Sequence, residues 1–335
     1  MVKRKQVFSL NIIIVTIGII VFSACQTDST MQTPDQSIQV HPSATGEEAT
    51  APEPTNTHPP ANTPEPSPTP VPPTLTLTEE PAFTPLPPEP QDVTFQADDG
   101  FVNIGRYYPA AINPAPIIIL MHWAPGDMED WNEIAFWLQN RELNGTSVNL
   151  GQETWLDPSW FPEMIDRQSF GVFTFSFRDC DAGCKNFQSN RSLWLLDAKA
   201  AMQKAAVLEG VDSSKLIAIG ASIGADGATD GCFLHNDITI DSCLGALSIS
   251  PGDYLTLPYA DVVSSLMEEP EPKYVWCLWA TGDVGAAGAC NSASGEQYLS
   301  VEWAGSAHGM DLLRPEVEPN VLLKILDFIT LVLEL

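Results

Sequence analysis

From residue 117 to the C-terminus, short apolar runs alternate with segments whose apolar residues have helical spacing, and this alternation constrains the fold more than any other feature. The run at 117–121 is Ile-Ile-Ile-Leu-Met, which is too short for a helix and typical of a strand covered on both faces. Comparable runs predict strands at 93–97, 101–108, 170–177, 215–219, 244–249, 274–280 and 298–303, with helices at 129–140, 193–209, from 225 onward and at 317–333. This order predicts an α/β fold with a mostly parallel sheet and helices on both faces.

The first 24 residues have the pattern of an export signal. Three basic residues at 3–5 precede an apolar run from 7 to 24, which ends in Val-Phe-Ser-Ala-Cys. This ending resembles the lipobox of bacterial lipoproteins, although Phe22 stands where that family usually has Leu. The resemblance implies cleavage before Cys25 and a lipid on its thiol, so that the protein meets the membrane only through this anchor. The alternative is an uncleaved transmembrane anchor, and both interpretations place the remaining chain outside the cytoplasm.

Residues 25–90 change abruptly in composition. Seventeen of the 29 prolines fall at 26–90, together with many Thr, Ser and Glu residues and without any apolar period. Such a segment cannot bury enough apolar surface to offset its ordering entropy, so we expect an extended, solvated tether. Residues 91–335 remain, about 245 residues, which suits one large α/β domain.

The chain is strongly acidic, with a formal net charge of −28 at pH 7. A surface of this charge argues against nucleic acid or anionic lipid as a partner. It does not identify a substrate.

Six cysteines besides Cys25 fall in the predicted domain as three close pairs. The pairs are Cys180/Cys184, Cys232/Cys243 and Cys277/Cys290. In an exported domain an even number of cysteines predicts disulfides, and loop closure favours pairing of nearest neighbours. Zinc is the competing interpretation, but no Cys-x-x-Cys motif lies near a histidine pair.

The pentapeptide Gly-Ala-Ser-Ile-Gly at 220–224 lies directly after one predicted strand and directly before a predicted helix. A sharp strand-to-helix turn of this kind exposes the central hydroxyl, and small residues on either side of it let the strand and helix pass closely. Ser222 is therefore the candidate nucleophile, and the N–H of Ile223 at the start of the helix would point at a developing oxyanion. The alternative is a tight packing turn that contains an incidental serine.

A nucleophilic serine needs a base and a carboxylate that orients the base. His308 lies in a flexible loop between the last predicted strand and the closing helix, which makes it the candidate base. Asp283 directly follows the strand 274–280 and is the favoured acid, with Asp253 after strand 244–249 as the competitor. We expect His122 to be structural.

The order Ser222, Asp283, His308 resembles the α/β-hydrolase superfamily, and in particular its dienelactone-hydrolase-like members. The resemblance covers about residues 92–335 and includes Ser-Pro-Gly at 250–252 and Ala-His-Gly at 307–309. It implies an α/β-hydrolase fold and a Ser-His-Asp triad without cofactor or metal. Only 24 residues lie between the predicted strands that end at 249 and begin at 274, so no large cap domain is expected.

The resemblance also implies a second oxyanion donor in the loop after strand 117–121. Members of the family usually carry His-Gly there, whereas this chain has His122-Trp123-Ala124, so the second donor is assigned to Trp123 or Ala124. Two further features lie near the expected site. The insertion 141–169 has an aromatic group that either lines a pocket or packs against the domain, and Arg178 either binds an anion or pairs with a carboxylate.

The expected function is that of an extracytoplasmic serine hydrolase that cleaves a carboxylic ester of a small or polymer-attached acyl substrate. Two alternatives stay open: a serine peptidase with the same triad, and a non-catalytic binding module on the cell surface.

Overall fold

The computed structural model describes residues 84–143, 157–181, 183–239 and 242–335. The predictions for the signal at 1–24, for Cys25 and for the tether up to residue 83 lie outside these ranges. Residues 84–90 contact the folded domain: the carbonyl oxygen of Leu86 accepts from Arg141 over 2.7 Å and that of Pro88 from Gln139 over 2.8 Å.

The described residues form one eight-stranded sheet in the order β1-β2-β4-β3-β5-β6-β7-β8. The strands are β1 (Gln91–Gln96), β2 (Val102–Tyr108), β3 (Ala115–Met121), β4 (Gly171–Phe175), β5 (Val211–Ala221), β6 (Cys243–Ile249), β7 (Tyr274–Ala280) and β8 (Tyr298–Trp303). From β4 to β8 every neighbouring pair is parallel, while β1 and β2 pair antiparallel at one edge and β2 pairs antiparallel with β4. The predicted mostly parallel sheet is therefore confirmed.

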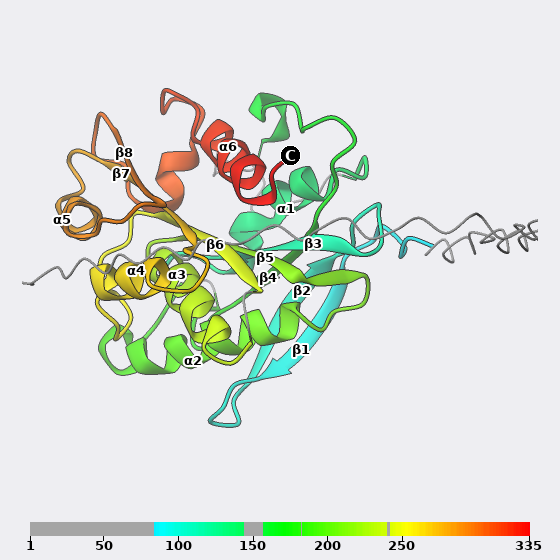
Figure 1. The fold of residues 1–335 in the computed structure, drawn as a ribbon, viewed down its shortest axis with the longest axis horizontal. Helices are drawn as coiled ribbons and strands as arrows, with labels where there is room; N and C mark the ends of the chain where they lie inside the picture. Colours follow the sequence, from blue (N-terminus) through cyan, green and yellow to red (C-terminus); the bar gives the residue numbers. More distant parts are fainter. Residues whose placement is uncertain (1–83, 144–156, 182, 240–241) are drawn as a thin grey trace, which may run out of the picture. The chain divides into compact units, whose positions relative to one another are not determined.

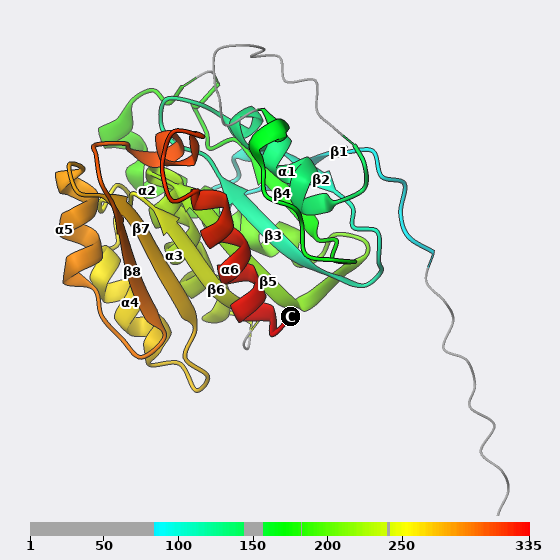
Figure 2. The same ribbon diagram turned by 90° about the horizontal axis from the view of Figure 1, so that it is seen from above.

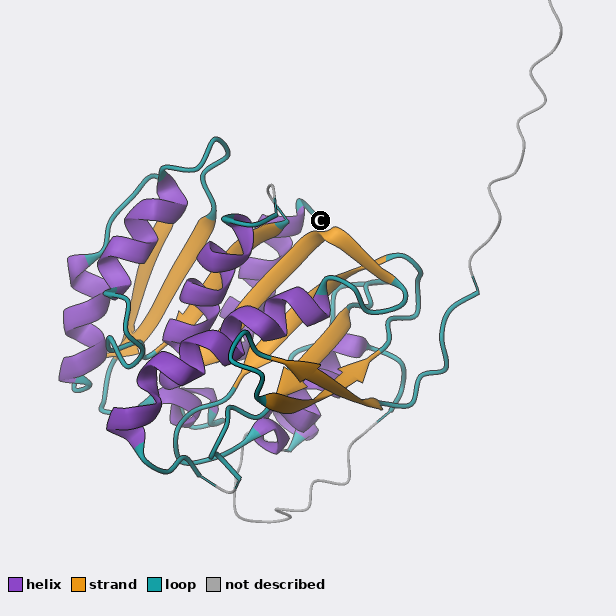
Figure 3. Cartoon of the chain, turned by 90° about the horizontal axis from the view of Figure 1, so that it is seen from below, coloured by secondary structure: helices purple, strands orange, loops and turns teal. Residues whose placement is uncertain are grey.

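Helices cover both faces of this sheet (Figure 1). The helices are η1 (Met128–Trp131), α1 (Asn132–Gln139), η3 (Pro158–Trp160), α2 (Phe187–Ala205), α3 (Ile223–Asn236), α4 (Tyr259–Met267), α5 (Val284–Ser292), η4 (Gly309–Leu313) and α6 (Val321–Leu333). In Figure 2 α6 lies in front of the strands, and Figure 3 shows the opposite face, which other helices cover.

Strand β3 shows how the two faces are filled. Ile117, Ile119 and Met121 join the core beneath α2, α3, α4 and α5, whereas Ile118 and Leu120 join the core beneath α1 and α6. All five side chains are fully buried because successive residues of a strand point to opposite faces and both faces are covered. A continuous apolar run is therefore the sequence expected for this strand.

Two α-helices, α4 and α5, were not predicted from the sequence. In α4 the residues Tyr259, Val262, Val263 and Leu266 are buried at helical spacing, so its signal was present but short. Helix α5 consists mostly of Ala and Gly and has no apolar stripe; the Asp283 side chain caps it by accepting from the N–H of Ala286. The helix predicted at 193–209 spans 187–205, which adds a turn and a half at its start.

Residues 250–273, between β6 and β7, are all described, and α4 is the only helix among them. This connection contains no large cap, in agreement with the prediction.

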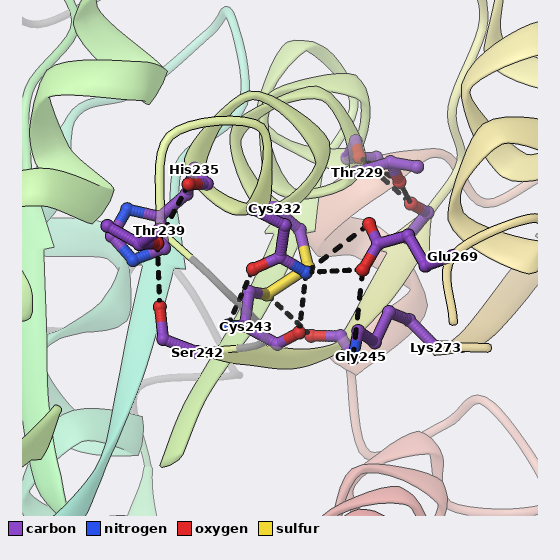
Figure 4. Close-up of a disulfide and its surroundings, with 12 residues drawn as sticks. Thr229, Cys232, His235, Thr239, Ser242, Cys243, Gly245, Glu269 and Lys273 are labelled. Carbon is purple, nitrogen blue, oxygen red and sulfur yellow. Dashed lines mark hydrogen bonds and ion pairs between the residues drawn. A yellow bond between two sulfur atoms is a disulfide. The ribbon is translucent and has the colours of Figure 1, made fainter. Parts of the chain in front are cut away.

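Three disulfides pair Cys180 with Cys184, Cys232 with Cys243, and Cys277 with Cys290, which are the nearest-neighbour pairs. Figure 4 shows the second of them, which joins the last turns of α3 to the first residue of β6. Disulfides are typical of proteins in oxidising compartments, so these three indicate a location outside the reducing cytoplasm. Among the described helices none combines the length and the hydropathy that a membrane span requires.

Candidate functional site

Ser222 occupies a sharp turn between β5 and α3. Its backbone has φ 54° and ψ −117°, a conformation that costs free energy in any residue other than glycine. The turn is held on both sides: the Ser222 N–H donates to the carbonyl of Ile249 over 2.8 Å, and the Ser222 carbonyl accepts from Ala225 over 2.9 Å. The serine is therefore fixed at the carboxyl end of the sheet.

The two glycines of the pentapeptide are required by close backbone contacts. A Cβ on Gly220 would lie 1.8 Å from the carbonyl oxygen of Gly224, and a Cβ on Gly224 would lie 2.2 Å from that of Met121. Real Cβ atoms do not approach backbone oxygens so closely, so no side chain fits at either position. The turn is thus a strand-to-helix elbow of the predicted kind.

The structure brings the predicted base and acid to this serine. The Nε2 atom of His308 lies 2.9 Å from the Ser222 hydroxyl, and its Nδ1 atom lies 2.6 Å from Oδ2 of Asp283. An ionised carboxylate can only accept, so Nδ1 carries the proton and Nε2 presents its lone pair to the serine hydroxyl. This is the arrangement that a general base needs before it can activate a serine.

The loops of the acid and the base are connected to each other through their backbones. The N–H of Gly282 donates to the carbonyl of Gly305 over 2.7 Å, and Thr281 donates to Trp303 over 2.8 Å. Gly305 has φ 114°, which glycine adopts without strain. The orientation of His308 relative to Asp283 therefore depends on the ends of two adjacent strands.

Asp253, the competing acid, serves another purpose. Its carboxylate accepts the N–H of Tyr259 over 2.7 Å at the start of α4, and it makes no hydrogen bond to His308. The sequence placed both acids after strands and favoured Asp283; the fold shows which hydrogen bond each carboxylate makes.

The loop after β3 contains the two candidates for the second oxyanion donor. The side chain of His122 hydrogen-bonds to the backbone of this loop. His122 is fully buried, which lowers its pKa to about 4, and its Nε2 accepts the N–H of Phe177 over 3.0 Å. Its other nitrogen, Nδ1, therefore carries the proton and donates to the carbonyl of Trp123 over 2.7 Å. The neutral imidazole thus fixes the peptide that links Trp123 to Ala124, a structural role as expected.

The bulky Trp123 side chain is accommodated by two glycines. Its indole N–H donates to Asp130 over 2.7 Å, and a Cβ on Gly126 would lie 1.6 Å from that carboxylate. A Cβ on Gly309 would lie 3.1 Å from Cε3 of Trp123 and 3.5 Å from Cβ of Ser222. Trp123 therefore borders the nucleophile.

Tyr254 also belongs to the site, although it is not among the residues predicted from the sequence. Its ring is perpendicular to that of His308, with 6.0 Å between centroids. Burial, with the nearby carboxylates Asp283 and Asp226, raises the pKa of Tyr254 to about 12, so the phenol stays neutral. The sequence feature that could have identified Tyr254 is its position two residues after Ser-Pro-Gly at 250–252, which follows the end of β6.

Two acids of α3 are buried near the elbow. Asp226 accepts the N–H groups of Gly252 and Tyr254, and burial raises its pKa to about 7. Asp230, one turn further, has no hydrogen-bond partner among the described residues, and burial raises its pKa well above the ordinary value. His235 lies in the last turn of the same helix, at the opposite end from Ser222.

Arg178 is committed to structural ion pairs. Its guanidinium bonds to the buried Asp197 and to Asp99 and lies over the ring of Phe101. Of its two predicted roles, pairing with carboxylates is the one observed.

The aromatic residues of the insertion that are described pack against the domain. Phe161 makes an edge contact with Trp137 of α1, whose indole donates to the carbonyl of Pro162 over 2.8 Å. A pocket of about 250 Å³ lies between α1 and this segment, and none of its lining residues belongs to the triad. Trp155 lies outside the described residues.

Comparison with known proteins shows the fold and nothing finer. No protein-family model and no curated protein sequence matches the chain. Among solved structures, the α/β hydrolase GrgF from Penicillium sp. sh18 aligns with a TM-score of 0.50 at 12% identity, covering 74% of this chain and 100% of that one.

Two further solved structures align with lower scores. A dienelactone-hydrolase-like promiscuous phosphotriesterase, P91, from metagenomic libraries gives 0.47 at 15% identity over 74% of this chain and 98% of its own. The esterase Pf2001 of Pyrococcus furiosus gives 0.45 at 14% identity over 72% and 91%. The strand order and the likeness to GrgF establish the α/β-hydrolase fold for residues of the described domain.

Proposed function

We propose that this chain is a serine hydrolase that cleaves a carboxylic ester through an acyl-enzyme. The observation that carries the proposal is the position of His308, whose two ring nitrogens lie within hydrogen-bond reach of Ser222 and Asp283. The α/β-hydrolase fold supports it, because the elbow, acid and base follow the carboxyl ends of β5, β7 and β8, three parallel strands of that fold.

In the first step the Ser222 oxygen attacks the ester carbonyl while Nε2 of His308 takes the hydroxyl proton. Asp283 holds the tautomer and stabilises the imidazolium that forms. The carbonyl oxygen becomes an oxyanion, which the Ile223 N–H at the start of α3 and a backbone N–H of the Trp123–Ala124 segment stabilise. When the bond to the alcohol breaks, His308 returns the proton to the leaving oxygen, and the acyl group remains on Ser222.

In the second step water attacks the acyl-enzyme while Nε2 of His308 takes its proton. Collapse of the second tetrahedral intermediate breaks the bond to Ser222, which regains a proton from His308. The products are the free acid and the alcohol, and the chain returns to its starting state.

A fluorophosphonate probe tests this proposal, because it forms a covalent bond only with an activated serine. We expect the wild-type protein to be labelled and Ser222→Ala to stay unlabelled. Absence of labelling on folded wild-type protein would overturn the proposal. Para-nitrophenyl esters of short and long acids, tested beside a peptide amide, then separate an esterase from a peptidase.

The cellular setting is part of the proposal. The three disulfides and the lipobox-like ending at Cys25 favour an exported domain that a lipid holds at the membrane. Incorporation of labelled fatty acid into wild-type protein and not into Cys25→Ser is the expected result; equal incorporation would contradict the anchor.

A further inference from the structure

The base of the proposed triad is held by hydrogen bonds only at its two nitrogens. His308 bonds to Ser222 at Nε2 and to Asp283 at Nδ1, and about a third of its side chain, 34%, is exposed. These two bonds fix the ends of the imidazole but oppose a rocking motion of the ring only weakly. A packing contact against the ring is needed to keep the imidazole aligned between Ser222 and Asp283 during proton transfer.

The ring of Tyr254 makes such a packing contact. It meets the imidazole at an interplanar angle of 90° with a centroid distance of 6.0 Å. On another side the Tyr254 ring makes a perpendicular contact with Phe187, the first residue of α2, at 6.1 Å. Perpendicular contacts are a favourable geometry for aromatic pairs, so the ring connects α2 to the base.

The backbone of Tyr254 is held as firmly as its ring. Its N–H donates to the carboxylate of Asp226, and its carbonyl accepts from Nε of Arg191 over 2.8 Å. Asp226 is four residues after Ser222 on the same helix, so the helix that carries the nucleophile also fixes the residue that contacts the base.

Gly252 makes room for this arrangement. A Cβ on Gly252 would lie 2.4 Å from Cζ of Tyr254, which means that the ring folds back over the glycine. The loop 250–254 therefore presents the ring in one orientation, toward His308.

We infer that Tyr254 is a positioning residue whose ring holds the His308 imidazole in line between Ser222 and Asp283. The inference rests on the proposed function and deepens it. It assigns the effect to the aromatic ring rather than to the hydroxyl, so phenylalanine serves in place of tyrosine and an aliphatic residue does not.

The test compares Tyr254→Leu with Tyr254→Phe on full-length protein, using para-nitrophenyl butyrate. Small displacements of a catalytic group cost rate more than binding, so kcat should fall about 10- to 100-fold in Tyr254→Leu while KM stays within about threefold. Tyr254→Phe should retain kcat within about threefold. Phe187→Leu, which loosens the other side of the same ring, is the matched control and should lower kcat far less.

Several results would overturn the inference. A raised KM with unchanged kcat in Tyr254→Leu would make Tyr254 a wall of the substrate pocket. An equal loss in Tyr254→Phe would assign the effect to the hydroxyl, and an equal loss in Phe187→Leu would assign it to general loosening. Melting temperatures show whether the variants fold, and Tyr254→Met replaces Tyr254→Leu if the latter does not. Failure of the proposed function is recognised separately, because wild-type protein would then neither react with the fluorophosphonate nor turn over the ester.

Discussion

The backbone N–H of Cys184 donates to the carbonyl oxygen of Ala124 over 2.7 Å. A small loop closed by the Cys180–Cys184 disulfide thereby contacts the loop that follows β3, where we place the second oxyanion donor. His122 holds the same loop through the preceding carbonyl, that of Trp123. The segment that must point an N–H at the substrate is thus fixed at two successive carbonyls.

This contact predicts a catalytic effect of one particular disulfide. Cys180→Ser/Cys184→Ser keeps the backbone N–H of residue 184 but removes the disulfide that closes its loop, so the hydrogen bond to the Ala124 carbonyl should weaken. The kcat for an ester should then fall about tenfold, less than the 10²–10³-fold typical of losing a whole oxyanion donor. The control is Cys232→Ser/Cys243→Ser, which removes the disulfide shown in Figure 4. It should reduce unfolding stability by about 2–3 kcal/mol and leave kcat nearly unchanged. Equal kcat losses in both variants would contradict the assigned role of Cys184.

The two acids that follow strands should differ sharply in their effect on catalysis. Asp283→Asn removes the carboxylate that fixes the His308 tautomer, and kcat should fall about 10⁴-fold. Asp253→Asn changes only the hydrogen bond at the start of α4, so it should cost about 1 kcal/mol of stability or less and alter kcat only a few-fold. Steady-state kinetics at neutral pH decide between them. A larger loss in Asp253→Asn would transfer the acid role to that residue.

The buried acids of α3 predict how stability depends on pH. Burial raises the pKa of Asp226 to about 7 and that of Asp230 well above its ordinary value, so the folded state binds protons that the unfolded state has released. Their contribution to stability is complete below the unfolded pKa near 4 and is lost as pH rises toward the folded values.

Asp230→Asn removes the titrating group without changing the side-chain size. The free energy of unfolding should therefore rise relative to wild type, and the difference should grow from pH 5 to pH 8. Denaturant titrations at several pH values measure this difference. A gain that does not depend on pH would show that Asp230 is ionised in the folded protein.

Substitution by alanine should have opposite effects on stability at Gly224 and at Gly288. In Gly224→Ala the new Cβ would meet the Met121 carbonyl at 2.2 Å, so the elbow should open, fluorophosphonate labelling should disappear and the melting temperature should drop. Gly288 lies inside α5, and apart from its chain neighbours and the backbone of its own helix no atom lies within 4 Å of an added Cβ. Gly288→Ala should therefore stabilise the fold by about 0.5–1 kcal/mol without affecting labelling. Retained labelling in Gly224→Ala would contradict the close packing of the elbow.

Much of the domain could be predicted because its signals are local. The buried runs at 117–121 and 274–280 lie within β3 and β7, since a strand covered on both faces needs a continuous apolar sequence. Helix α5 could not be predicted, because small residues carry no periodic signal and its start depends on a cap from Asp283.

For the site, the sequence determined the candidates: a serine between small residues at a strand end, a histidine in a late loop, and two carboxylates after strands. Each of these depends on residue type and on order along the chain. The sequence already favoured Asp283 over Asp253. The hydrogen bond of Asp283 to His308, the contact of Tyr254 with His308 and the pairing of Arg178 with Asp197 were decided only by the tertiary structure. These relationships join residues from different strands and loops, and distances between such residues are set by the packing of the sheet rather than by their spacing in the chain.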